Sequence, residues 1–226
     1  MIVLAFDTAC DACSAAVWQD GELRAQEFAA MARGQSEALM PMIARVMALA
    51  NVGFADLAGI GVTNGPGAFT GLRIGLAAAR AMALASAKPA IGVTTLEAIA
   101  AAANIAGELV VAIDAKREDL YLQRFANGAP AESPYAALPG AFVAPAGPYA
   151  LAGDGAARLF ETLPQETRAR VSLLAEPRLP DAAVVARLAA ERLAAGVDIA
   201  SPRPLYLRPP DAKLPQDGGR VKVMPS

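Results

Sequence analysis

The sequence predicts an α/β protein with two similar lobes that face each other across a cleft. Two observations support this fold class: strand patterns alternate with helical patterns along the chain, and the start of the first half recurs in the second. The 226 residues suffice for one large domain or for two lobes of roughly 100 residues each. We therefore divide the chain into an N-terminal lobe (1–105), a C-terminal lobe (106–200) and a C-terminal tail (201–226).

Two aspartates, 107 residues apart, anchor the repeat. Ala5-Phe6-Asp7 is followed by the turn glycine Gly21, and Ala112-Ile113-Asp114 is followed at the same spacing by Gly128. Between the anchors each half carries an alternating strand pattern, Ser14–Trp18 in the first and Tyr121–Phe125 in the second. The repeat predicts a duplication, with the two aspartates at equivalent strand ends that border the cleft.

The first half begins as an antiparallel meander and continues as strand–helix units. Asp20-Gly21 is a hairpin signal between the second and third strands. Ser36 can cap a helix, and Thr94 with Glu97 forms a capping-box pattern. The expected elements are strands at 2–7, 13–19 and 22–29, a helix at 36–50, a strand at 58–63, a helix at 70–85, a strand at 89–93 and a helix at 94–103.

The second half ends in the same kind of strand–helix units. A strand at 149–153 leads through the Gly153-Asp154-Gly155 turn into a helix, and a strand at 171–174 precedes a helix at 181–195. Gly196 suits the position just after that last helix. The uncharged stretch 133–153 contains four prolines, so it predicts loop and irregular strand and excludes a membrane-spanning helix.

The composition excludes several classes of enzyme and metal site. The chain has no histidine, which removes Ser-His-Asp and Cys-His hydrolases and every zinc site that needs an imidazole. A net charge of −2 is unfavourable for a stand-alone nucleic-acid binder, although the tail 201–226 leans basic. The N-terminus lacks a positively charged segment before its apolar run, so we expect a cytoplasmic protein.

Three motifs each admit a functional and a structural interpretation. Asp7 and Asp114 suit Mg-phosphate binding, but we favour the hypothesis that each ends its strand by accepting bonds from turn amides. The loop 64–71 could present amides to an anion, but it lacks the P-loop ending, and we favour a sharp turn in which Gly71 and Gly75 allow close packing. Cys10 and Cys13 have the spacing of a redox pair, but they do not open a helix, which favours a core or turn role.

The helix at 36–50 is apolar on two sides. One apolar stripe has the spacing that suits a core and consists of Leu39, Met42, Ile43, Val46 and Leu49. Met40 and Met47 project toward another side of the helix. Ordinary core filling is one explanation. A second is a partner protein, because methionine is favoured on adaptable binding surfaces. For the helices 36–50 and 70–85 we predict a partner interface formed by Met40, Met47, Leu72, Leu76 and Met82.

Five segments together resemble the TsaB family, also called YeaZ. The resemblance spans nearly the whole chain, and its glycine-rich run is highly specific. The segments are Ala5-Phe6-Asp7-Thr8; Gln35-Ser36-Glu37 with Leu39 and Pro41; Asn64-Gly65-Pro66-Gly67-Ala68-Phe69-Thr70-Gly71-Leu72-Arg73-Ile74-Gly75; Gly92-Val93-Thr94-Thr95-Leu96-Glu97; and Pro204-Leu205-Tyr206-Leu207-Arg208.

The resemblance implies a fold of the actin, Hsp70 and sugar-kinase type and a non-catalytic role. It also implies that the chain is the partner of a related TsaD protein, which makes threonylcarbamoyladenosine beside the tRNA anticodon with help from the TsaE ATPase. We accordingly expect no catalytic residues, metal or cofactor, and at most indirect contact with tRNA. Because an apolar patch that suits a partner of similar fold often suits its own copy, the chain can also pair with itself when it is alone. The family usually has histidine where this chain has Gln35. The alternative is a small-molecule phosphotransferase that uses Asp7 and Asp114.

Overall fold

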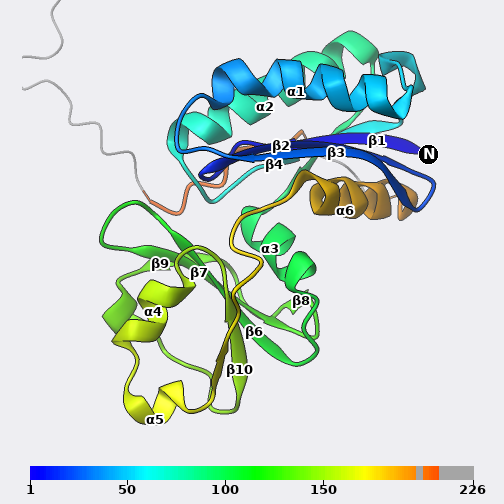
Figure 1. The fold of residues 1–226 in the computed structure, drawn as a ribbon. Coiled ribbons are helices and arrows are strands. Elements are labelled where there is room, and N and C mark those ends of the chain that lie inside the picture. The colour runs from blue at the N-terminus through cyan, green and yellow to red at the C-terminus, as the bar shows by residue number, and fades with distance from the viewer. Residues whose placement is uncertain (197–200, 209–226) are drawn as a thin grey trace, which may run out of the picture.

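The computed structural model describes residues 1–196 and 201–208, which form two lobes, each built on one β-sheet (Figure 1). The first sheet has the strand order β3-β2-β1-β4-β5. β1 pairs antiparallel with β2 and β2 with β3, while β4 and β5 run parallel to β1. The strands are β1 (Ile2–Asp7), β2 (Ala12–Gln19), β3 (Glu22–Ala30), β4 (Gly59–Thr63) and β5 (Ala90–Val93).

The second sheet repeats this arrangement around β6. Its order is β11-β10-β6-β7-β8, with β9 also paired to β7. An antiparallel partner, β7, lies on one side of β6, and two parallel strands lie on the other. The strands are β6 (Glu108–Asp114), β7 (Leu120–Ala126), β8 (Ala129–Pro130), β9 (Tyr135–Ala137), β10 (Tyr149–Ala152) and β11 (Val171–Leu173). The predicted α/β fold with two similar lobes is therefore confirmed.

The pairing register of β2 with β1 differs by one residue from that of β7 with β6. Asp7 lies opposite Ser14, whereas Asp114 lies opposite Leu120, so the second hairpin is one residue shorter. The constant spacing of 107 residues thus holds for the two aspartates and the two turn glycines but not for the paired strands between them.

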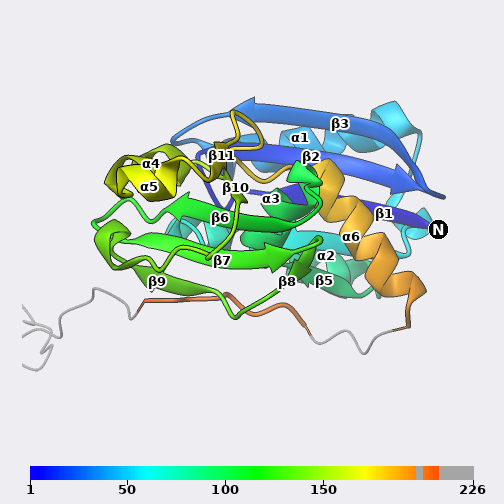
Figure 2. The same ribbon diagram turned by 90° about the horizontal axis from the view of Figure 1, so that it is seen from below.

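Helices cover both faces of the first sheet (Figures 1 and 2). α1 (Gln35–Ala50) and α2 (Phe69–Ser86) lie on one face, and α6 (Ala182–Ala194) crosses the other, where it contacts β1, β2 and β4. β2 is consequently buried along most of its length. The remaining helices are α3 (Thr95–Ala103), α4 (Ala156–Thr162) and α5 (Gln165–Arg168), with short 3-10 turns at Phe54–Asp56 and Pro139–Ala141.

Two helices pack against the sheet of the opposite half of the sequence. α6 follows the second sheet along the chain but packs on the first, and α3 precedes the second sheet yet contacts β6, β7 and β10. The two helices also touch each other, and Arg192 Nη2 donates to Glu97 Oε1 at 3.0 Å. A boundary at residue 105 therefore separates the two sheets but not the helices that cover them.

The helix ends match the predictions except at α1. The Thr94 hydroxyl accepts from the Glu97 amide at 3.0 Å, and Glu97 Oε2 accepts from the Thr94 amide at 2.9 Å, which confirms the capping box. Gly196 has a positive φ just after α6, as expected. Ser36 is not the cap of α1, because the helix starts one residue earlier, after Gly34 at φ 97°.

Within residues 1–196 and 201–208, no helix combines the length and apolar character that crossing a bilayer requires.

Candidate functional site

Close backbone packing joins the loop after β1 to the start of α2. The Thr8 hydroxyl donates to the Gly71 carbonyl at 2.7 Å, and the Ala68 amide donates to the Ala9 carbonyl at 2.7 Å. A Cβ atom on Gly71 would lie 2.0 Å from the Thr8 carbonyl oxygen, and one on Gly67 would lie 2.3 Å from that of Ala9. Gly71 therefore permits close contact, as the structural interpretation of the loop expected, and so does Gly75, where a Cβ would lie 2.8 Å from the Thr8 hydroxyl oxygen. The close contact at Gly67 was not predicted.

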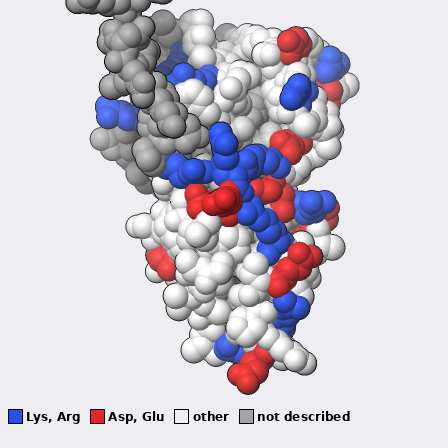
Figure 3. Space-filling model, turned by 90° about the vertical axis from the view of Figure 1, so that its left-hand side faces the viewer, with Lys and Arg blue, Asp and Glu red and all other residues white. Residues whose placement is uncertain are grey.

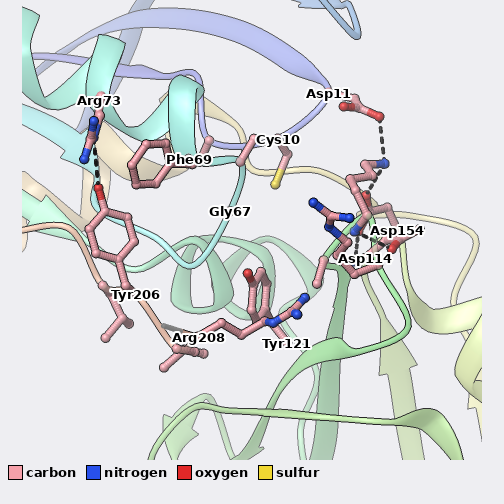
Figure 4. A pocket seen from close by; sticks show the side chains of 17 residues that line it. Cys10, Asp11, Gly67, Phe69, Arg73, Asp114, Tyr121, Asp154, Tyr206 and Arg208 are labelled. Atoms are coloured by element: carbon pink, nitrogen blue, oxygen red, sulfur yellow. Dashed lines mark hydrogen bonds and ion pairs between the residues drawn. The ribbon is translucent and has the colours of Figure 1, made fainter. Parts of the chain in front are cut away.

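A cavity of about 650 Å³ opens between the lobes beside this contact (Figure 4). The start of α2 and the loop after β1 form one wall, and the loop after β6 forms the other. Residues 205–208 complete the enclosure. Its lining includes Phe69, Arg73, Asp114, Lys116, Tyr121 and Tyr206.

Residues 201–208 bind both lobes instead of extending away as a separate tail. The Leu205 amide donates to the Asn64 carbonyl at 2.7 Å, and Arg80 donates to the Pro202 carbonyl at 2.8 Å. Arg208 then forms an ion pair of 3.2 Å with Asp119 of the second lobe. The predicted C-terminal tail begins with this segment, which these contacts attach to both lobes, and the rest of the tail lies outside the described residues.

Asp7 and Asp114 occupy equivalent turns but different environments. Asp7 Oδ1 accepts from the Ala9 amide at 3.0 Å, and Asp114 Oδ1 accepts from the Lys116 amide at 2.8 Å, as the turn interpretation predicted. Asp7 is fully buried, and Asp114 is partly exposed in the cavity wall. The prediction that both aspartates border the cleft is therefore wrong for Asp7.

Burial also changes the acidity of Asp7. Loss of hydration raises its pKa from 3.8 to about 7, although the Thr63 hydroxyl and the Ala9 amide both donate to the carboxylate and favour its ionised form. Its second oxygen, Oδ2, has no hydrogen-bond partner among the described residues. Thr63 could not be predicted as a partner of Asp7, because this contact depends on the pairing of β1 with β4.

Lys116 connects the two lobes at the far end of the cavity. Its ammonium lies 2.8 Å from Asp11 Oδ2 of the first lobe and 3.7 Å from Asp154 Oδ2 of the second. Burial raises the pKa of Asp154. Lysine and arginine side chains lie next to acidic side chains in the region between the two lobes (Figure 3). Among the described residues, no group of three or more histidine, cysteine, aspartate or glutamate residues could hold a metal ion.

The two cysteines and Gln35 have structural surroundings. Cys10 and Cys13 are both buried and free of any disulfide, as the core interpretation predicted. Burial raises the pKa of the Cys13 thiol to about 11 and that of Cys10 well above its usual value. Gln35 donates from Nε2 to the Met31 carbonyl at 3.0 Å, and to that of Cys10 at 3.4 Å, so this amide ties the start of α1 to the loop after β1.

The structure changes the predicted partner interface. Met40 is 51% exposed on α1, but Met47 is only 6% exposed and belongs to the core of the first lobe. Leu72, Leu76 and Met82 are also buried within the chain, so of the five predicted residues only Met40 offers an exposed side chain. Leu49, which was expected in the core stripe, is 74% exposed.

A different set of apolar side chains forms the outer surface of α1 and α2, which we call the α1/α2 face. Small residues dominate it, with Leu84 86% exposed near the end of α2. Beside it, Phe54 borders a hollow of about 370 Å³ together with α2. The exposed apolar residues of the α1/α2 face are Met40, Pro41, Ala44, Ala48, Leu49, Ala77, Ala81, Leu84 and Ala85.

Comparisons with known proteins place this fold in a family. A family model described as "TsaD: tRNA N6-adenosine threonylcarbamoyltransferase" matches residues 29–136. An uncharacterized protein of Mycobacterium tuberculosis is 35% identical over 213 residues, which cover 93% of each chain. The solved structure "YeaZ from Pseudomonas aeruginosa" superimposes with a TM-score of 0.80 at 28% identity, over 91% of this chain and 99% of that one. The chain belongs to the TsaB (YeaZ) family.

A relative that carries the TsaB name aligns over part of its length. The Escherichia coli "tRNA threonylcarbamoyladenosine biosynthesis protein TsaB" is 37% identical over 134 residues, which cover 57% of this chain and 58% of that protein. This chain thus spans somewhat more than half the length of that curated relative. The motifs that suggested the TsaB family include two cavity residues whose position the sequence reasoning did not predict, Arg73 and Tyr206.

Proposed function

We propose that this chain is a non-catalytic subunit that binds and supports a TsaD-type threonylcarbamoyltransferase in the formation of threonylcarbamoyladenosine in tRNA. The observation that carries the proposal is the α1/α2 face, which is apolar and uncovered by any other described element of the chain. An exposed apolar surface of this kind marks a docking site in many soluble proteins.

The composition of the α1/α2 face favours a helical partner. A second pair of helices can approach this face closely because it carries alanines, at positions 44, 48, 77, 81 and 85. Met40 and Leu84 supply larger apolar side chains. The match of residues 29–136 to a TsaD model supports a partner of similar fold, because this segment contains α1 and α2. The same face would serve self-association of the chain when no partner is present.

Two arrangements disfavour a catalytic role for the chain alone. Asp7 is buried away from the cavity, so the aspartate pair of the alternative phosphotransferase does not face a common ligand. Burial also keeps both thiols protonated at neutral pH, which makes them poor nucleophiles. We further propose that a TsaE-type ATPase acts on the assembled pair, that tRNA contact is at most indirect, and that the complex works in the cytoplasm.

Reconstitution tests the proposal. Threonylcarbamoyladenosine formation on tRNA is measured with the TsaD-type homologue and the TsaE-type ATPase from the same source, in the presence and absence of this chain. We expect product only when the chain is present, and none from the chain by itself. Turnover of Mg-ATP by the isolated chain that disappears in Asp7→Asn would support the phosphotransferase instead.

A further inference from the structure

We propose that residues 202–208, which we call the strap, form a latch between the two lobes. The strap stays fixed to the first lobe and releases the second lobe at the ion pair between Arg208 and Asp119. Its release opens the end of the cavity that residues 205–208 enclose. The strap is not part of the α1/α2 face, so the inference does not depend on the proposed docking of a partner.

The first lobe is shaped to hold the strap against its backbone. A Cβ atom on Gly65 would lie 2.8 Å from the Leu205 carbonyl oxygen, and one on Gly92 would lie 3.0 Å from the Cβ of Pro202. Both distances are shorter than an ordinary van der Waals contact. A side chain at either glycine would therefore push the strap away from the lobe.

Hydrogen bonds to main-chain atoms fix the path of the strap on the first lobe. The Leu205 amide donates to the Asn64 carbonyl at 2.7 Å, and Asn64 Nδ2 donates to the Arg203 carbonyl at 3.2 Å. Arg80 Nη2, from α2, donates to the Pro202 carbonyl at 2.8 Å. The first half of the strap is thus bound at three successive points.

Tyr206 continues this attachment along the wall of the cavity (Figure 4). Its ring centroid lies 5.5 Å from that of Phe69, and its hydroxyl accepts from Arg73 Nε at 3.3 Å. The Arg73 guanidinium in turn lies 3.7 Å from the centre of the Phe69 ring. Because these side chains pack on one another at the start of α2, Tyr206 belongs mechanically to the first lobe.

The second lobe holds the strap by charge. Arg208 Nε lies 3.2 Å from Asp119 Oδ2 in the loop between β6 and β7, and the two side chains are 31% and 24% exposed. A partly exposed ion pair is weakened by salt and by loss of either charge. Main-chain hydrogen bonds and ring packing depend far less on salt, so the strap should detach at Arg208 first.

A separate link between the lobes lies at the far end of the cavity. Lys116 of the second lobe is 2.8 Å from Asp11 of the first. This pair remains when Arg208 is released. Release of the strap therefore opens the near end of the cavity and leaves the far end joined.

The two cysteines can report opening and unfolding separately. Cys10 lines the cavity and belongs to an apolar cluster that includes Ile113 and Phe125 of the second lobe. Opening of the cavity would expose its thiol. Cys13 belongs to a cluster made of first-lobe residues, so its thiol stays buried until that lobe unfolds.

Thiol labelling of the full chain tests the latch. The chain has two cysteines, so Cys13→Ala leaves Cys10 as the reporter, and Cys10→Ala leaves Cys13. Arg208→Gln should raise the labelling rate of Cys10 at least fivefold and that of Cys13 less than twofold. An unchanged Cys10 rate would overturn the proposal, and so would equal acceleration of both thiols, which indicates a general loss of stability.

Matched variants and salt locate the release at the ion pair. Asp119→Asn should reproduce the effect of Arg208→Gln, and the double variant should label no faster than either, because both changes remove one interaction. Sodium chloride at about 0.5 M should accelerate the labelling of Cys10 more in the chain with the intact pair than in Arg208→Gln. Arg187→Gln, which breaks an ion pair with Glu191 on α6, is the control and should change nothing. Independent, multiplying effects of the two single changes would contradict a shared latch.

Discussion

Met40 and Met47 lie on the same side of α1, seven residues apart, yet one is 51% exposed and the other 6%. Residues seven apart project in nearly the same direction from a helix, so helical periodicity predicts the same environment for both methionines. The difference arises from neighbours: Met47 belongs to a core cluster that includes Met82 of α2, whereas Met40 lies outside that cluster and is half-exposed. A docking partner can therefore touch Met40 but not Met47.

Glutamate at these two positions should have opposite effects. Met47→Glu should unfold the first lobe, because an unpaired carboxylate buried in an apolar core costs several kcal/mol. Met40→Glu should leave the unfolding free energy within about 0.5 kcal/mol of wild type, as for most surface substitutions. Urea denaturation followed by circular dichroism measures both. A stable, folded Met47→Glu protein would contradict the assignment of Met47 to the core.

Alanine at Gly71 should destabilise the protein although it replaces a helical glycine. Glycine to alanine in an exposed helix normally gains about 1 kcal/mol. Here the new Cβ would stand 2.0 Å from the Thr8 carbonyl oxygen, so we expect a loss of roughly 1–3 kcal/mol instead. Gly140→Ala is the control, since no atom lies within 4 Å of its Cβ position. Equal melting temperatures for the two variants would show that the close contact at Gly71 does not lower the stability of the alanine variant.

The raised pKa of Asp7 predicts that stability falls as pH rises. The native state holds a proton on this carboxyl up to pH of about 7, whereas the unfolded chain loses it near 3.8. The stabilisation is thus complete below pH 4 and is lost as the pH rises through 7. A shift of this size corresponds to about 4 kcal/mol.

Asp7→Asn isolates this contribution. Asparagine retains an acceptor oxygen for Ala9 and Thr63 but cannot ionise. The chain contains no histidine, so few other side chains titrate between pH 5 and 8. Unfolding free energies measured across this range should decline for the wild type and remain nearly level for the variant. Parallel slopes for the two proteins would mean that Asp7 is ionised in the native state.

The two thiols should be unreactive in the folded protein. Both side chains are buried, and burial raises both pKa values, so little thiolate exists at pH 8. A chromogenic disulfide reagent should label them only at the rate of unfolding. Replacement of both by alanine should preserve association with the TsaD-type partner. Loss of association in a folded double variant would assign the cysteines a role beyond packing.

Patterns that depend on local sequence predicted the fold well. The meander, the strand–helix units and the capping box at Thr94 follow from turn residues and side-chain periodicity, which act over a few residues. The repeat of Ala5-Phe6-Asp7 in Ala112-Ile113-Asp114 indicated the two similar sheets. The exchange of α3 and α6 between lobes could not be predicted in this way, because it depends on which sheet face remains uncovered.

The candidate site was less predictable for the same physical reason. Side chains from the start of α2, from β7 and from residues 205–208 meet only after the two lobes have assembled. No spacing in the sequence brings Tyr206 to Phe69 or Arg208 to Asp119. The sequence equally could not show that Asp7 is buried while Asp114 is exposed, since the two have similar local neighbours.

The most direct test of the central proposal is the affinity of this chain for a purified TsaD-type homologue from the same source, measured by calorimetry. We expect wild type and Val143→Glu, an exposed change in the second lobe, to bind equally. Met40→Glu and Ala81→Glu, both on the α1/α2 face, should weaken binding at least a hundredfold while remaining folded. Wild-type affinity in both face variants, or no binding by the wild type, would contradict the account.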